Sequence, residues 1–152
     1  MMKEAIKLVL KEETTFDLYF LDGVVKRYDI ISLSDKFPQL TALEDRELFL
    51  KGKLLGWGAV VWNDELDISS ETVYEEGIDV SNEYDDIANV VIGYKIKQKR
   101  LELNLSQQQL ANNIGIDQSD LSKIEKGLFN ITIKMLNRIA DGLNCKITID
   151  IK

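Results

Sequence analysis

The side chains best suited to binding chemistry lie in one short helical segment, predicted to run from Gln118 to Lys126. Near its start, four polar residues lie on the side away from the apolar positions Leu121 and Ile124: Gln118, Ser119, Ser122 and Lys123. Hydroxyl and amide groups both donate and accept hydrogen bonds, glutamine matches adenine N6 and N7, and lysine matches guanine. The pattern therefore predicts contacts to the edges of DNA bases.

A second set of polar residues suits the phosphate backbone. Ser106 and Gln107 open the preceding predicted helix, and the positively polarised start of a helix attracts a phosphate oxygen. Lys126 and Asn130 flank Gly127 and are the next candidates for phosphate contacts.

The sequence offers little for catalysis. It contains no histidine and one cysteine, Cys145, so we expect neither a disulfide nor a zinc or other transition-metal site. It has no glycine-rich phosphate loop, and its acidic pairs, such as Asp64-Glu65, are adjacent residues that point in different directions. We expect no enzyme activity and no cofactor, and we interpret Cys145 as a small buried apolar residue.

Helical periodicity supplies the elements that must position these residues. Apolar residues recur at helical spacing from Val91. Ser106 and Gln109 form a capping box for a second helix, which Gly115 ends. We expect Asp117 to cap the third helix, which ends at Gly127, and Thr132 to cap a fourth. The tail from Lys146 to Lys152 alternates apolar and polar residues, which predicts a terminal strand.

Together these residues carry a family resemblance over about a third of the chain. The string Ile92-Gly93-x-x-Ile96-x-x-x-Arg100, continued by Leu105-Ser106-Gln107-x-x-Leu110-Ala111-x-x-Ile114-Gly115-Ile116-x-Gln118-Ser119-x-Leu121-Ser122-x-Ile124-Glu125-x-Gly127, resembles the Cro/cI-type (XRE, lambda-repressor-like) helix-turn-helix family. The resemblance implies an all-α DNA-binding domain whose third helix enters the major groove. It also implies that Gln107 contacts the backbone and orients a reading glutamine. Arg100 and Glu125 would form a structural ion pair between the first and third helices.

The first half of the chain has the residue pattern typical of short strands. We predict strands over 5–10, 15–20 and 24–28, with a hairpin turn at Asp22-Gly23, then a helix over 43–50 and a strand over 54–62 that brings Trp57 and Trp62 into the core. This is a small α+β domain with an antiparallel sheet and a short helix. The strings Phe16-x-Leu18-x-Phe20-x-Asp22-Gly23 and Trp62-Asn63-x-x-Leu66-Asp67-Ile68 resemble the bacterial domain of unknown function 2442, which implies no chemistry.

Charge separates the two halves. The chain has a net charge of −7, but residues 1–90 sum to −11 and residues 91–152 to +4. We therefore divide it into an α+β domain over 1–74, an acidic linker over 75–90 and the helix-turn-helix domain with its terminal strand over 91–152. No window is apolar enough for a membrane span, and we expect a cytoplasmic protein.

Two functions fit these observations. The first is a sequence-specific transcriptional regulator of the repressor type, which binds double-stranded DNA at a palindromic operator as a homodimer. The terminal strand over 145–151 is a candidate dimer element, because an apolar strand edge seeks a partner. The alternative is an antitoxin or adaptor, whose acidic N-terminal domain binds a protein partner such as a toxin while the helix-turn-helix autoregulates the operon.

Overall fold

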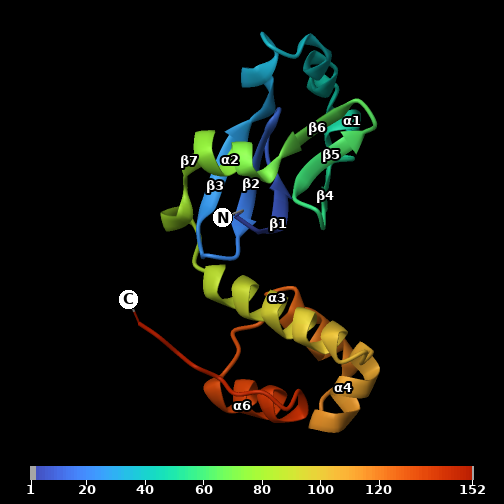
Figure 1. Cartoon of the computed structure of the whole chain (residues 1–152), viewed down its shortest axis with the longest axis vertical. Coiled ribbons are helices and arrows are strands. Elements are labelled where there is room, and N and C mark those ends of the chain that lie inside the picture. Colours follow the sequence, from blue (N-terminus) through green and yellow to red (C-terminus); the bar gives the residue numbers. More distant parts are fainter. Residues whose placement is uncertain (1–2, 152) are drawn as a thin grey trace. The chain divides into compact units, whose positions relative to one another are not determined.

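The computed structural model describes residues 3–151 and divides the chain after Asp85 into two compact units. Residues up to Asp85 form unit 1, which contains the strands, and residues from Asp86 form unit 2, which contains the longer helices (Figure 1).

Unit 1 is built on two antiparallel sheets. The first has the strand order β1-β2-β3-β7, with β1 at Ala5–Leu10, β2 at Thr15–Phe20, β3 at Val25–Asp29 and β7 at Ile78–Asp79. The second has the order β4-β5-β6, with β4 at Lys53–Leu55, β5 at Ala59–Asn63 and β6 at Leu66–Ser69. Gly23 takes a φ of 89° in the predicted β2–β3 hairpin, a conformation that glycine adopts without strain.

The helical elements of unit 1 cover its core. They are the 3-10 helices Ile30–Leu33, Pro38–Glu44 and Ser81–Glu83 and the α-helices α1 (Arg46–Phe49) and α2 (Ser70–Glu76). Trp62 packs into the core and donates its indole N–H to the carbonyl of Phe49. The single strand predicted over 54–62 is instead the β4–β5 hairpin. Because Trp57 lies at its turn, that side chain is 65% exposed and its predicted place in the core is wrong.

The acidic linker predicted over 75–90 is folded chain in the structure. Its first part belongs to unit 1, because β7 pairs with β3 and Glu83 forms an ion pair with Arg27. Its last part, from Ile87, is the first turn of a helix. The acidic composition of this segment is typical of a solvated connector. Its contacts are not visible in the local sequence, because the partners of Glu83 and Tyr84 lie more than 50 positions earlier in the chain.

Unit 2 contains the helices α3 (Ile87–Glu102), α4 (Gln107–Ile114), α5 (Gln118–Glu125) and α6 (Ile133–Gly142). The predicted capping box of Ser106 and Gln109 is present, and Gly115 ends α4 with a φ of 74°. Thr132 accepts the N–H of Met135 and caps α6. Asp117 occupies the N-cap position of α5, but its side chain accepts no cap hydrogen bond, so that part of the prediction is wrong.

A close approach of backbones explains the glycine of the Ile92-Gly93 motif. A Cβ atom at position 93 would lie 2.3 Å from the carbonyl oxygen of Ile124 and 2.8 Å from that of Glu125. A side chain at this position would force the backbones of α3 and α5 apart, so only glycine allows them to pack this closely.

The segment from Cys145 to Ile151 is not a strand within this chain, contrary to the prediction. It leaves α6 as an extended tail (Figure 1). A strand is defined by hydrogen bonds to a neighbouring strand, and the described residues of unit 2 provide none. Cys145 lies partly buried on the core of unit 2, so its predicted burial is only partial.

Candidate nucleic-acid interface

Helix α5 presents two different faces. Leu121 and Ile124 are buried in the core of unit 2, as expected from their spacing. On the other face Gln118, Ser119 and Lys123 are exposed, and Ser122 is half-buried. The structure thus places the predicted base-contacting residues together on the solvent side of the first two turns of α5.

The start of α4 is fixed by its cap. The hydroxyl of Ser106 accepts the N–H of Gln109 at 3.0 Å, and the amide oxygen of Gln109 accepts the N–H of Ser106 at 2.8 Å. The first backbone N–H groups of an α-helix have no acceptor within the helix. An exposed, capped helix start of this kind can donate hydrogen bonds to a phosphate oxygen.

A continuous chain of hydrogen bonds connects the interior to Gln118. Arg100 donates from Nε to Oε2 of Glu125 at 2.7 Å and from Nη2 to Oε1 at 3.0 Å. Gln107 donates to the same Oε1 at 3.1 Å. The amide oxygen of Gln107 in turn accepts from Nε2 of Gln118 at 2.6 Å. Gln107 therefore holds the first residue of α5 in a fixed orientation.

The ion pair predicted between Arg100 and Glu125 is present and buried. Only 7% of the Arg100 side chain and 2% of the Glu125 side chain are exposed. The hydrogen bond to Glu125 raises the pKa of Arg100 above its ordinary value. Arg100 also donates to the carbonyl of Leu105, just before the cap of α4. The guanidinium therefore holds α3, α4 and α5 together.

Lys126 and Asn130, the other predicted phosphate contacts, are exposed on either side of Gly127. Oδ1 of Asn130 accepts a hydrogen bond of 2.9 Å from Asn89 in the first turn of α3. The amide nitrogen of Asn130 is thereby directed away from Asn89. The ammonium of Lys123 lies 5.6 Å from the ring centre of Phe129, so α5 and this loop are also in contact.

Arg138 is a positioning residue that sequence reasoning missed. Its Nη2 donates to the carbonyl of Ile114, the last residue of α4, beside the turn at Gly115. This contact stabilises the connection between α4 and α5. Within the sequence, Arg138 looks like an ordinary charged residue on the outer face of the fourth helix, and no local signal identifies its partner.

Unit 1 contains a second polar network, which the sequence did not predict. Asp17 is fully buried in β2 and accepts two hydrogen bonds from Arg27, at 2.8 and 2.9 Å. Arg27 also pairs with Glu83, and the Tyr84 hydroxyl donates to Asp17. Burial, with a further contribution from Asp17, raises the pKa of Tyr84 to about 12. This network attaches residues 83–84 to the first sheet.

Residues 3–151 include no group of three or more histidine, cysteine, aspartate or glutamate side chains that could hold a metal ion. None of the helices in this range is both long and apolar enough to cross a membrane.

Comparison with known proteins gives a family match for unit 2. Residues 96–149 match the family model HTH_3, described as helix-turn-helix. The chain is 34% identical over 53 residues to an uncharacterised HTH-type transcriptional regulator from Archaeoglobus fulgidus, a match that covers 35% of this chain and 75% of the relative.

Solved structures are also similar to the chain. The restriction-modification controller protein C.Esp1396I, solved as a tetramer with its natural 35-base-pair operator, is 36% identical over 36% of this chain and 72% of its own, with a TM-score of 0.35. NE0471 from Nitrosomonas europaea is 18% identical over 91% of this chain and 85% of its own, with a TM-score of 0.45.

Proposed function

Since this chain belongs to the HTH_3 helix-turn-helix family and is a DNA-binding transcriptional regulator, we propose that it represses transcription by binding a palindromic operator as a homodimer. In this proposal α5 enters the major groove. Gln118, Ser119, Ser122 and Lys123 contact base edges, and Ser106, Gln107, Lys126 and Asn130 contact phosphates.

The main support is the hydrogen-bond chain that ends at Gln118. A glutamine recognises adenine through two hydrogen bonds, and these require a defined orientation of its amide plane. The bond of 2.6 Å to Gln107 restricts that orientation before DNA arrives. Less conformational entropy is then lost on binding, which favours specific contacts.

Electrostatics supports the proposed phosphate contacts. From position 91 on, lysine and arginine outnumber aspartate and glutamate by ten to six, although the whole chain is acidic. Neutralised phosphates release counterions, so the DNA affinity should fall as salt concentration rises. Each lysine that contacts a phosphate should add about one unit to the salt slope.

The direct test is selection of bound DNA from a random pool with the full chain, at two salt concentrations. The proposal predicts an enriched palindrome with half-sites about 34 Å apart. Gln118→Ala should weaken binding to the selected site about tenfold. Gln98→Ala is the control: it removes a glutamine of α3 that is not among the proposed DNA contacts, and it should bind normally. Binding with a steep salt dependence and no enriched sequence would contradict the proposal.

The second candidate function, an antitoxin or adaptor, is supported by one groove of unit 1. This groove of about 410 Å³ is lined by the apolar Phe37 and Leu40, by the carboxylates of Glu65, Asp67 and Glu76, and by Lys36. Apolar side chains beside three carboxylates and one ammonium give the groove a negative balance, which suits a basic protein partner. Co-expression with the product of the adjacent reading frame tests it: a complex that Asp67→Lys disrupts would support this function, and no complex would contradict it.

A further inference from the structure

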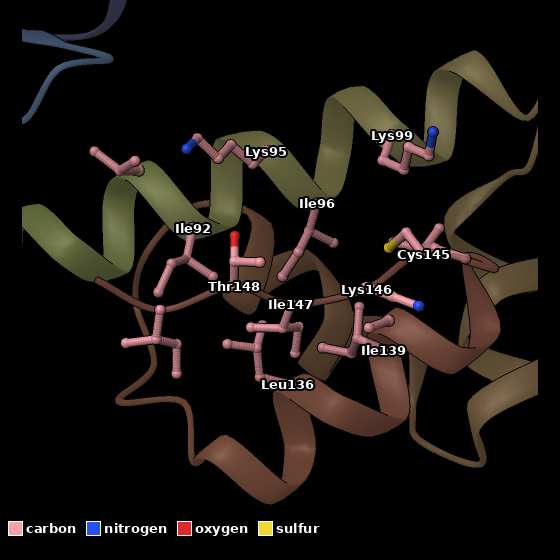
Figure 2. Close-up of a pocket in the computed structure, with 14 residues that line it drawn as sticks. Ile92, Lys95, Ile96, Lys99, Leu136, Ile139, Cys145, Lys146, Ile147 and Thr148 are labelled. Carbon is pink, nitrogen blue, oxygen red and sulfur yellow. The ribbon is translucent and has the colours of Figure 1, made fainter.

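Only the first residues of the tail Cys145–Ile151 pack against the helices of unit 2. Its first apolar residues, Cys145 and Ile147, are half-buried in a groove of about 290 Å³ between α3 and α6. Figure 2 shows Ile147 between the helix that carries Ile92 and Ile96 and the helix that carries Leu136 and Ile139. The next apolar residues are far more exposed: Ile149, at the edge of the groove, is 62% exposed, and Ile151 is 93% exposed.

The alternation of this tail matches one face of a strand without a neighbour. Cys145, Ile147, Ile149 and Ile151 occupy alternate positions, with Lys146, Thr148 and Asp150 between them. An extended chain with an apolar row and unpaired backbone groups favours pairing with another strand. The described residues of unit 2 form no strand that could pair with it.

The sequence of the tail is complementary to itself about Thr148. In an antiparallel pair of two such tails centred on this residue, Lys146 of each copy lies opposite Asp150 of the other. Thr148 then faces Thr148, and Ile147 faces Ile149. Opposite charges, paired threonines and paired β-branched residues across antiparallel strands are all stabilising. A register displaced by two residues would place Lys146 opposite Thr148 and lose both charge pairs.

We propose that the tails of two copies of this chain pair as an antiparallel two-stranded ribbon centred on Thr148. This inference rests on the homodimer of the proposed function and names its interface. Such a pairing is isologous, because the same surface serves both copies, and it therefore closes at a dimer. The apolar row that begins in the groove at Ile147 continues over the ribbon, which covers Ile149 and Ile151.

Charge reversal in the full chain tests the register. In the Lys146→Asp dimer, the new aspartate of each copy lies opposite Asp150 of the other, which gives two repulsive pairs. In the Asp150→Lys dimer, the new lysine of each copy lies opposite Lys146 of the other, with the same effect. Each variant should raise the dimer dissociation constant at least about tenfold in sedimentation equilibrium. The double variant Lys146→Asp/Asp150→Lys exchanges the two charges and should recover the value of the unchanged chain. If the single variants dimerise normally, or if the double variant is weaker than either, the proposal is overturned.

A matched control addresses other apolar surface on the same unit. Ile133, at the start of α6, is 64% exposed, close to the 62% of Ile149. Ile149→Asp should weaken the dimer, whereas Ile133→Asp should leave it intact. If Ile133→Asp weakens the dimer and Ile149→Asp does not, the interface lies at α6 and the proposal is overturned. The proposal is also overturned if the chain without substitutions is a monomer.

Cross-linking gives an independent measurement. With Cys145→Ser as background, Thr148→Cys should form a disulfide-linked dimer on mild oxidation, because facing Cβ atoms lie about 5 Å apart. Lys146→Cys should not, because its symmetry mates would be about 14 Å apart along the ribbon. Equal cross-linking of both variants would contradict the centre at Thr148.

The two proposals fail in different ways. If the tails pair but no DNA site is selected, the ribbon stands and the proposed function fails. If the full chain binds a single half-site but the tail variants do not change its oligomeric state, DNA binding stands and the ribbon is wrong.

Discussion

Each unit contains an arginine that holds a buried carboxylate with two hydrogen bonds, yet the two pairs differ in surroundings. In unit 2 both members are buried, with 7% of Arg100 and 2% of Glu125 exposed. In unit 1 Asp17 is fully buried, but 28% of Arg27 is exposed and Glu83 gives it a second carboxylate. The first pair leads through Gln107 to the proposed DNA-binding surface, and the second leads to the segment at residues 83–84.

The two pairs should differ in how well the remaining arginine is solvated once its carboxylate partner is removed. A buried charge without a partner is costly, whereas a charge that water can reach is solvated again. Arg100 would lose its ionic partner in the interior, while Arg27 would keep both Glu83 and water. The same type of pair should therefore be worth different amounts in the two units.

Removal of the Glu125 carboxylate should have the largest effect. We expect Glu125→Ala to lower the free energy of unfolding of unit 2 by about 3–5 kcal/mol, because Arg100 is left buried and unpaired. Chemical denaturation followed by circular dichroism measures the change. If stability is unchanged and only DNA binding is lost, the pair has a binding role instead of a structural one.

The corresponding change in unit 1 should be milder. We expect Asp17→Ala to lower the free energy of unfolding by about 1–3 kcal/mol, because Tyr84 loses its acceptor while Arg27 keeps Glu83. The same denaturation experiment compares the two variants directly. A loss equal to that of Glu125→Ala would remove the distinction between the pairs.

Substitution of Gln107 should affect DNA binding more than it affects stability. Its side chain is half-buried and neutral, so Gln107→Ala should lower stability by about 1 kcal/mol or less. It should weaken binding to the selected DNA site about tenfold, because Gln118 is no longer oriented. A double-mutant cycle with Gln118→Ala, measured by fluorescence anisotropy, gives the coupling, and strictly additive losses would show that Gln107 does not position Gln118.

The last expected effect is on the alkaline titration of Tyr84. Its pKa is raised to about 12 in the folded chain, against an ordinary value of 10.0. The stabilisation is therefore complete below pH 10 and is lost as the pH rises from 10 towards 12. Tyr84→Phe should lose less stability than the unchanged chain over this window in parallel denaturation curves, and identical slopes would contradict the raised pKa.

These two networks also explain what the sequence could predict. The pair in unit 2 belongs to a motif in which the caps, the turn glycine and the apolar spacing agree, so family resemblance identified Arg100, Glu125 and Gln107 together. The fold of this unit was confirmed for the same reason, because each signal is local to one helix. The contact of Arg138 was not predicted, because its partner is a backbone carbonyl 24 residues earlier and no local sequence pattern indicates such a contact.

Unit 1 was predictable only in outline. Its strands and the Asp22-Gly23 hairpin were found, because alternation and turn residues are local signals. The network of Asp17 was not, because a buried aspartate on a strand looks like the solvent side of that strand. The acidic composition around Glu83 then suggested a linker. The resemblance of this unit to domain 2442 stays a prediction, since the matching family model covers residues 96–149 alone.

In the proposed complex, α5 contacts bases while the residues around Gly127 contact phosphates. Selection of DNA from a random pool with Lys123→Ala and, separately, Lys126→Ala tests it most directly. We expect Lys123→Ala to lose the base preference at one position of each half-site. Lys126→Ala should keep the selected sequence, bind more weakly to all DNA and reduce the salt slope by about 1. An unchanged preference with Lys123→Ala, or a changed one with Lys126→Ala, would contradict it.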